Sequence, residues 1–194
     1  GYFAAVTAMD LEIGRLLDRL EEKGLREQTL VVFTSDNGFS CGQHGFWGKG
    51  NGTYPPNMYE NSVKVPFVIS LPGAIEQGVV QREMVSAYDF MPTLLDYAGL
   101  PLPTGRNLPG QSFAPLLRGE GLGRDEVVVY DEYGGTRMLR TREWKYVHRY
   151  PDGPCELYDL VNDPDERVNR ADDASQVERI GALRGQLEAW FARY

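Results

Sequence analysis

An acidic residue and an amide stand side by side at Asp36 and Asn37, one residue after the β-branched and apolar run at 30–34. Carboxylate and amide oxygens are hard donors, which suit calcium or magnesium better than zinc or copper. Two such ligands fill only part of a calcium site, which needs about six to eight oxygens. A simple turn is the alternative, because Asp, Asn and the following Gly38 all tolerate tight backbone geometry. The pair therefore indicates either part of a metal site or a turn.

A histidine and a lysine follow in the same glycine-rich segment. Lys49 lies between Gly48 and Gly50, which leave its backbone open to the approach of an anion. Its ammonium group is a compact positive charge that suits a tetrahedral oxyanion. His44 could donate a proton to a leaving group, because imidazole titrates near neutral pH. Taken singly, each has a simpler interpretation as a solvated loop side chain. His148 lies in a predicted strand and is interpreted as structural.

The elements around these residues predict an α/β fold. Apolar residues at helical spacing between 6 and 20 indicate an amphipathic helix that ends near Lys23, where Gly24 can take a left-handed conformation. The apolar runs at 30–34 and 66–70 are typical of strands buried on both faces of a parallel sheet. Ligands bind at the carboxyl ends of such strands, which is the position of Asp36 and Asn37.

A second group of elements follows a connector at about 100–125 that is rich in proline and glycine. Short strand candidates are separated by turn residues and predict an antiparallel meander at 127–133, 137–141, 144–150 and 156–159. A helix with an apolar stripe between 177 and 191 is expected to cover one face of that sheet. We therefore expect two units, an α/β core at 1–124 and a small α+β subdomain at 125–194.

Composition excludes several classes of function. The formal net charge of −8 argues against a binder of nucleic acid or of membrane surfaces, because both need a basic surface. No run approaches the roughly 18–20 apolar residues of a membrane span. Cys41 and Cys155 lack the spacing of a zinc site, and we expect two free thiols. Arginine supplies most of the 20 basic residues, a compositional indication of a bacterial source.

Several segments, taken in order, resemble the sulfatase family of the alkaline-phosphatase-like superfamily. They extend over nearly the whole chain, and the ordered set is more specific than any single piece. The matching segments are Ala-Ala-Val-Thr-Ala-Met-Asp at 4–10, Thr-Ser-Asp-Asn-Gly at 34–38, Gly-Gln-His-Gly-Phe-Trp-Gly-Lys-Gly at 42–50, Tyr-Glu-Asn-Ser-Val-Lys-Val-Pro-Phe at 59–67, Asp-Phe-Met-Pro-Thr-Leu-Leu at 89–95, Ala-Gly-Leu-Pro at 98–101, Arg-Glu-Trp-Lys-Tyr at 142–146, Glu-Leu-Tyr-Asp-Leu at 156–160 and Asn-Asp-Pro at 162–164.

This resemblance implies a sulfate-ester hydrolase built on an alkaline-phosphatase-like, mostly parallel sheet. It assigns Asp36 and Asn37 to a divalent cation, most often calcium, and Lys49 to the sulfate group. It also implies that His44 contacts the sulfate ester and protonates the leaving alcohol. The implied substrates are small sulfate esters or sulfated sugars. The asparagine at position 37 favours sulfate esters, while phosphodiesters and phosphonates stay open as alternatives on the same scaffold.

The chain departs from the family at the nucleophile. Sulfatases use a cysteine or serine in a Cys/Ser-x-Pro-Ser-Arg motif, which is converted to formylglycine, and neither Cys41 nor Cys155 stands in such a motif. The aspartate pair that completes the metal site in the family is also missing. We expect a C-terminal portion of a longer enzyme, which pairs with its N-terminal segment and hydrolyses nothing alone. A non-catalytic binding fragment with relic motifs is the other alternative.

Overall fold

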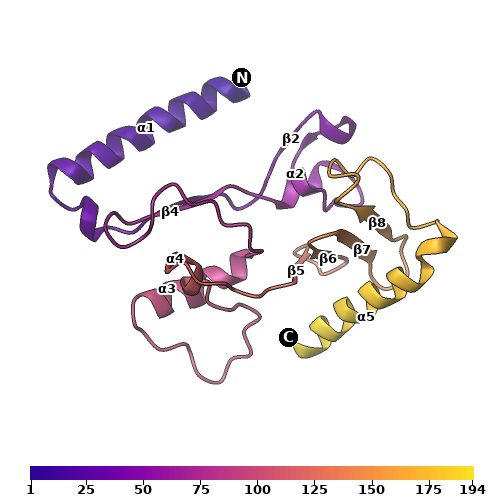
Figure 1. Cartoon of the computed structure of the whole chain (residues 1–194). Coiled ribbons are helices and arrows are strands. Elements are labelled where there is room, and N and C mark those ends of the chain that lie inside the picture. Colours follow the sequence, from indigo (N-terminus) through magenta and orange to yellow (C-terminus); the bar gives the residue numbers. More distant parts are fainter.

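The computed structural model describes residues 1–194, with helices arranged around one four-stranded and two two-stranded sheets (Figure 1). The α-helices are α1 (Tyr2–Glu22), α2 (Glu60–Val63), α3 (Phe90–Tyr97), α4 (Ala114–Leu117) and α5 (Val177–Arg193). The strands are β1 (Val31–Thr34), β2 (Ser40–Cys41), β3 (Trp47–Gly48), β4 (Phe67–Ser70), β5 (Glu126–Tyr130), β6 (Thr136–Thr141), β7 (Trp144–Arg149) and β8 (Glu156–Asp159). Both cysteines are free thiols, as predicted.

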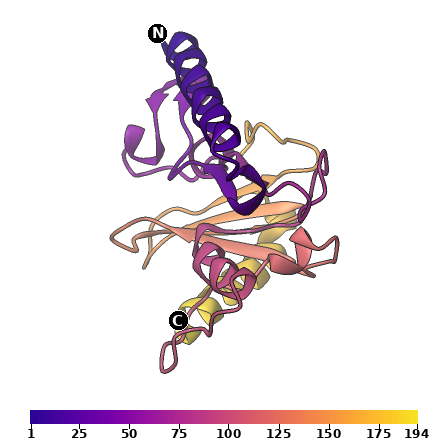
Figure 2. The same cartoon turned by 90° about the vertical axis from the view of Figure 1, so that its left-hand side faces the viewer.

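Helix α1 ends within one residue of the predicted position. Glu22 is its last residue, and Gly24 follows in the left-handed conformation with a φ of 66°. The Leu25 amide donates to the Leu20 carbonyl at 2.9 Å, which closes the helix end. No residue of α1 is buried, and the helix projects away from the four-stranded sheet (Figure 2). No helix of the structure has the length and apolarity needed to cross a membrane.

The two apolar runs form strands that pair with each other, but the parallel direction and the burial on both faces predicted for each run are wrong for this pair. β1 and β4 run antiparallel, with Val31 opposite Ser70 and Thr34 opposite Phe67. Neither strand is fully buried. A parallel pair needs a crossover, usually a helix, that carries the chain back to the start of the sheet. The only α-helix in residues 35–66 is the four-residue α2, and the short hairpin of β2 and β3 does not carry the chain back, so β4 begins at the end where β1 finishes.

The C-terminal sheet, formed by β5 to β8, is the predicted antiparallel meander. Its strands lie in the order β5-β6-β7-β8, so neighbours in sequence are neighbours in space. The strand predicted to reach 133 ends at Tyr130, because the Asp131 carboxylate closes a turn there. That carboxylate accepts hydrogen bonds from the backbone amides of Tyr133, Gly135 and Thr136.

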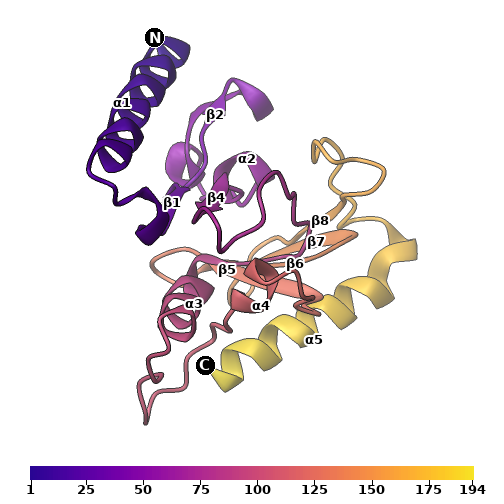
Figure 3. The same ribbon diagram turned by 60° about the vertical axis from the view of Figure 1, so that its left-hand side comes forward.

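Both faces of the C-terminal sheet are covered. Helix α5 lies along one face, as predicted (Figure 3), and the larger apolar core between them consists of Val128, Leu139, Tyr146, Leu157, Leu183 and Leu187. On the opposite face Met58 packs against Met138 and Val147. Since Met58 lies two residues before α2, the loop before α2 forms part of the core of the sheet. The division of the chain into 1–124 and 125–194 stays a prediction.

Candidate active site

The chain turns sharply after β1, at the position of Asp36 and Asn37. Ser35 Oγ donates to the backbone carbonyl of Asn37 at 2.8 Å and lies 3.4 Å from Asp36 Oδ1. The next residue, Gly38, lies so close to α2 that a Cβ there would be 2.0 Å from the backbone oxygen of Asn61. A side chain at position 38 would therefore displace the turn, and glycine allows the close approach.

A short hairpin returns the chain from this turn to Lys49. β2 and β3 pair antiparallel, and Lys49 directly follows β3. Its Nζ donates a hydrogen bond to Asn37 Oδ1 at 3.1 Å. Asp36 and Lys49 are both exposed. The structure thus brings Asn37 and Lys49 into direct contact, with Asp36 adjacent to them in the chain.

His44 lies at the tip of the same hairpin, in the single turn Gln43–Gly45. It takes the left-handed conformation with a φ of 56°, which is uncommon for any residue other than glycine. Its exposed imidazole stacks flat on the ring of Tyr59, with ring centroids 3.7 Å apart and planes inclined by 2°. No hydrogen bond joins His44 to Asn37 or Lys49, so the three side chains share a loop without forming one bonded group.

The donor atoms around Asn37 fit a hard cation. Asp36 offers an exposed carboxylate, and the Asn37 amide oxygen has two lone pairs, of which Lys49 uses one. Nowhere in residues 1–194 do three or more His, Cys, Asp or Glu side chains form a group that could hold a metal ion. Asp36 and Asn37 could therefore supply two oxygens of a calcium site, which leaves most of its about six to eight ligands to other groups.

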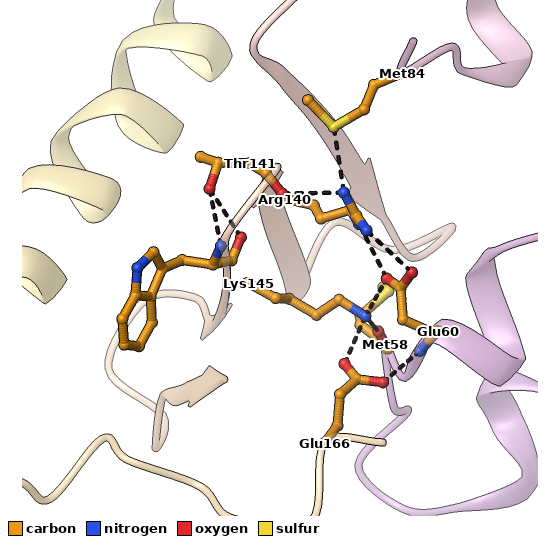
Figure 4. A network of polar contacts seen from close by, with 8 residues as sticks. Met58, Glu60, Met84, Arg140, Thr141, Lys145 and Glu166 are labelled. Atoms are coloured by element: carbon orange, nitrogen blue, oxygen red, sulfur yellow. Dashed lines mark hydrogen bonds and ion pairs between the residues drawn. The ribbon is translucent and has the colours of Figure 1, made fainter. Parts of the chain in front are cut away.

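A buried ion network lies next to Tyr59, and it is absent from the predictions made from the sequence. It consists of Glu60, Arg140, Lys145 and Glu166 (Figure 4). Lys145 is fully buried in β7, with its Nζ 2.8 Å from Glu60 Oε1 and 2.6 Å from Glu166 Oε1. Arg140 Nε lies 3.2 Å from the same Glu60 oxygen. Two cations and two carboxylates balance in charge, as burial of ionic groups requires.

The two carboxylates of the ion network titrate differently. Burial raises the pKa of Glu166, and Lys145 offsets only part of that effect. Burial acts in the same direction on Glu60, but Lys145 and Arg140 together outweigh it and hold the pKa of Glu60 below its ordinary value. Glu60 therefore stays ionised to a lower pH than Glu166.

Comparison with known proteins decides the family. Residues 42–192 match the family model described as N-sulphoglucosamine sulphohydrolase, C-terminal. The chain belongs to the sulfatase family. Among sulfatase relatives, N-acetylglucosamine-6-O-sulfatase of Bacteroides thetaiotaomicron is 34% identical over all of this chain. Arylsulfatase K of Homo sapiens is 35% identical over 88% of it. This sulfatase chain covers 35% and 33% of those two proteins, about a third of their length.

Solved structures confirm that this chain has a sulfatase fold of the alkaline-phosphatase-like type. One of them is a complex of a protein with its substrate, D-glucosamine-2-N,6-O-disulfate. That protein is 34% identical to this chain, with a TM-score of 0.82. The match covers all of this chain and 40% of that one. A phosphonate monoester hydrolase of Agrobacterium radiobacter is 30% identical with a TM-score of 0.81, over 94% of this chain and 39% of that one.

Proposed function

We propose that the whole protein to which this chain belongs hydrolyses sulfate esters, with Asp36, Asn37 and Lys49 in its active site. The observation that carries the proposal is the 3.1 Å contact between Lys49 Nζ and Asn37 Oδ1. A cation bound to Asn37 would repel the ammonium of Lys49 at such short range unless an anion lay between them. A sulfate group meets both needs, because its oxygens can ligate the cation and accept hydrogen bonds from Lys49.

Calcium is the proposed cation, because Asp36 and Asn37 offer hard oxygen donors. When bound, it would neutralise developing charge on the sulfate oxygens as a Lewis acid does. Lys49 holds those oxygens while the bond between sulfur and the alcohol oxygen breaks. His44 passes a proton from its imidazolium to the departing oxygen and becomes neutral. The sulfuryl group is transferred to a hydroxyl nucleophile of the formylglycine type, which we place outside this chain.

A sulfated sugar is the substrate class that the relatives support. One relative is named for N-acetylglucosamine-6-O-sulfate hydrolysis, and one solved structure holds a sulfated glucosamine. A phosphonate or phosphodiester is the second candidate, because the likeness to a phosphonate monoester hydrolase is nearly as strong. A cation and an ammonium side by side would suit either kind of tetrahedral anion.

Turnover by the whole protein tests this proposal when sulfate, phosphate and phosphonate esters of the same alcohol are compared. We expect a strong preference for the sulfate ester, loss of turnover on chelation of calcium, and about a 100- to 1000-fold lower turnover in Lys49→Ala. A preference for the phosphonate or phosphate ester would replace sulfate with the second candidate. Unchanged turnover in Lys49→Ala would favour a relic site on a non-catalytic module.

A further inference from the structure

Two residues other than glycine have a positive φ in this structure, and both lie next to the same dipeptide. His44 has a φ of 56° and Glu166 a φ of 55°. Such conformations are strained, and they persist only where surrounding contacts hold them. Tyr59 stacks on His44, and the backbone amide of Glu60 donates to Glu166 Oε2 at 2.6 Å. The Tyr59–Glu60 dipeptide therefore links the hairpin tip to the ion network.

Tyr59 is held on both sides through its own peptide groups. The carbonyl of Met58 accepts a hydrogen bond from Lys145 Nζ at 2.9 Å. The amide of Glu60 is bound by the carboxylate of Glu166, which also lies 2.6 Å from Lys145 Nζ. Lys145 is fully buried and Glu166 is 3% exposed, so the solvent does not compete for these contacts. The C-terminal sheet thus fixes the backbone on either side of Tyr59.

The Tyr59 ring also lies near a buried aromatic ring of the C-terminal sheet. Tyr158 of β8 is 4% exposed, and its ring centroid lies 6.1 Å from that of Tyr59. Phe46 of the hairpin lies at 6.4 Å from the same ring. The half-buried Tyr59 ring is therefore near aromatic rings of both the C-terminal sheet and the hairpin, and the imidazole of His44 stacks on one of its faces.

We propose that Tyr59 is a positioning residue for His44, anchored by the buried pair Lys145 and Glu166. This inference rests on the proposed function, in which His44 protonates the departing alcohol. Flat stacking on Tyr59 fixes the plane of the imidazole and leaves both ring nitrogens, which lie in that plane, open to a substrate. The C-terminal sheet thereby contributes to the geometry of proton donation without touching the substrate.

The test compares two sulfate esters hydrolysed by the whole protein, one of a simple alkyl alcohol and one of 4-nitrophenol. An alkoxide needs a proton to depart, whereas 4-nitrophenolate departs without one, so only the alkyl ester depends on His44. We expect Tyr59→Leu to lower kcat for the alkyl ester about ten- to hundredfold more than for the nitrophenyl ester. Tyr59→Phe keeps the stacked ring and should retain wild-type values. Tyr133→Leu, at a tyrosine that is 86% exposed, is the matched control.

A double substitution sharpens the result. Tyr59→Leu added to His44→Ala should cost the alkyl ester nothing further, because positioning acts only through His44. Equal losses on both esters, or an additive double variant, would overturn the positioning role. If Tyr59→Leu does not fold, Tyr59→Met removes the ring and keeps an apolar side chain of similar length.

The proposed function can fail separately. If neither ester is hydrolysed, or if Lys49→Ala and His44→Ala leave turnover unchanged, the sulfatase chemistry fails and the role of Tyr59 in proton donation falls with it. If Lys49→Ala lowers turnover as expected but Tyr59→Leu preserves the ratio between the two esters, only the positioning inference fails. The resonances of the His44 ring protons report the stack directly, since a ring face at 3.7 Å shifts them upfield, and Tyr59→Leu should remove that shift.

Discussion

Lys49 and Lys145 carry the same charge, but their surroundings are opposite. Lys145 is fully buried, and its ammonium meets three fixed acceptors on Met58, Glu60 and Glu166. Lys49 is exposed and donates to one neutral amide oxygen. Three oxygens within 3 Å surround the ammonium of Lys145 and leave no room for a ligand, whereas Lys49 uses one of its three N–H groups and keeps two. The ion network around Lys145 stabilises the fold. Lys49 keeps N–H groups that the proposed anion would need.

The largest effect that follows from this contrast is on stability. Lys145→Met leaves Glu60 and Glu166 buried without their shared partner, and we expect a loss of about 3–5 kcal/mol in the free energy of unfolding. The matched change Lys49→Met should alter it by less than about 0.5 kcal/mol, because the side chain is exposed. Denaturant titration of the two variants at neutral pH measures both. Similar losses in the two variants would erase the distinction between the lysines.

Lys49→Met, the less destabilised of the two variants, should show the larger loss of activity. We expect Lys49→Met to lower kcat/KM for a sulfate ester about 100- to 1000-fold, equivalent to about 2.7–4 kcal/mol of transition-state stabilisation. Its thermal unfolding should match that of the wild type. Lys23→Met, at an exposed lysine after α1, serves as the control and should keep wild-type kinetics.

A smaller effect is the pH dependence of the stability that Glu60 contributes to the ion network. The pKa of folded Glu60 lies below its ordinary value of 4.5, so its ionised form stabilises the protein above that pH, and this contribution is lost as pH falls through the lowered pKa. Glu60→Gln should cost about 1.5–3 kcal/mol at pH 7. The difference in Tm between wild type and variant should narrow below pH 4.5. A difference independent of pH would show that Glu60 contributes by packing.

The smallest effect concerns the proposed cation. Asp36→Asn removes a charge from a site that uses only two side chains of this chain, and we expect calcium to bind at least about tenfold more weakly, or about 1.4 kcal/mol. Asp10→Asn, at an exposed aspartate of α1, is the control. Calorimetric titration of calcium into the whole protein measures both. Equal affinities would remove Asp36 from the site.

Features governed by local pattern could be predicted from the sequence. The end of α1 at Gly24 and the order of the meander follow from the turn residues and apolar periodicity of short segments. The pairing of β1 with β4 could not, because it depends on how residues 35–66 return the chain. The sulfatase family was identified from motifs, and that identification is confirmed. The roles of Asp36, Asn37, His44 and Lys49 stay predictions.

The ion network escaped prediction for a physical reason. Lys145 stands between Trp144 and Tyr146 in a strand, where a lysine usually faces solvent. Its burial becomes favourable only when Glu60 and Glu166, distant in sequence, reach the same point. The signal in the sequence that could have indicated the network is a lysine within an apolar strand, because such a lysine needs buried partners when both faces of the sheet are covered. The stack of Tyr59 on His44 is hidden for the same reason, since it joins a hairpin tip to the loop before α2.

The coupling between calcium and inorganic sulfate tests the shared site most directly. Calcium is titrated into the whole protein with and without sulfate, in wild type and in Lys49→Ala. Because the anion would bridge the cation and the ammonium, we predict that sulfate tightens calcium binding about 5- to 150-fold in the wild type. Lys49→Ala should bind calcium with little response to sulfate. Calcium binding that does not respond to sulfate in the wild type, or a coupling that survives in Lys49→Ala, would contradict a site in which one oxyanion lies between Lys49 and a cation bound to Asn37.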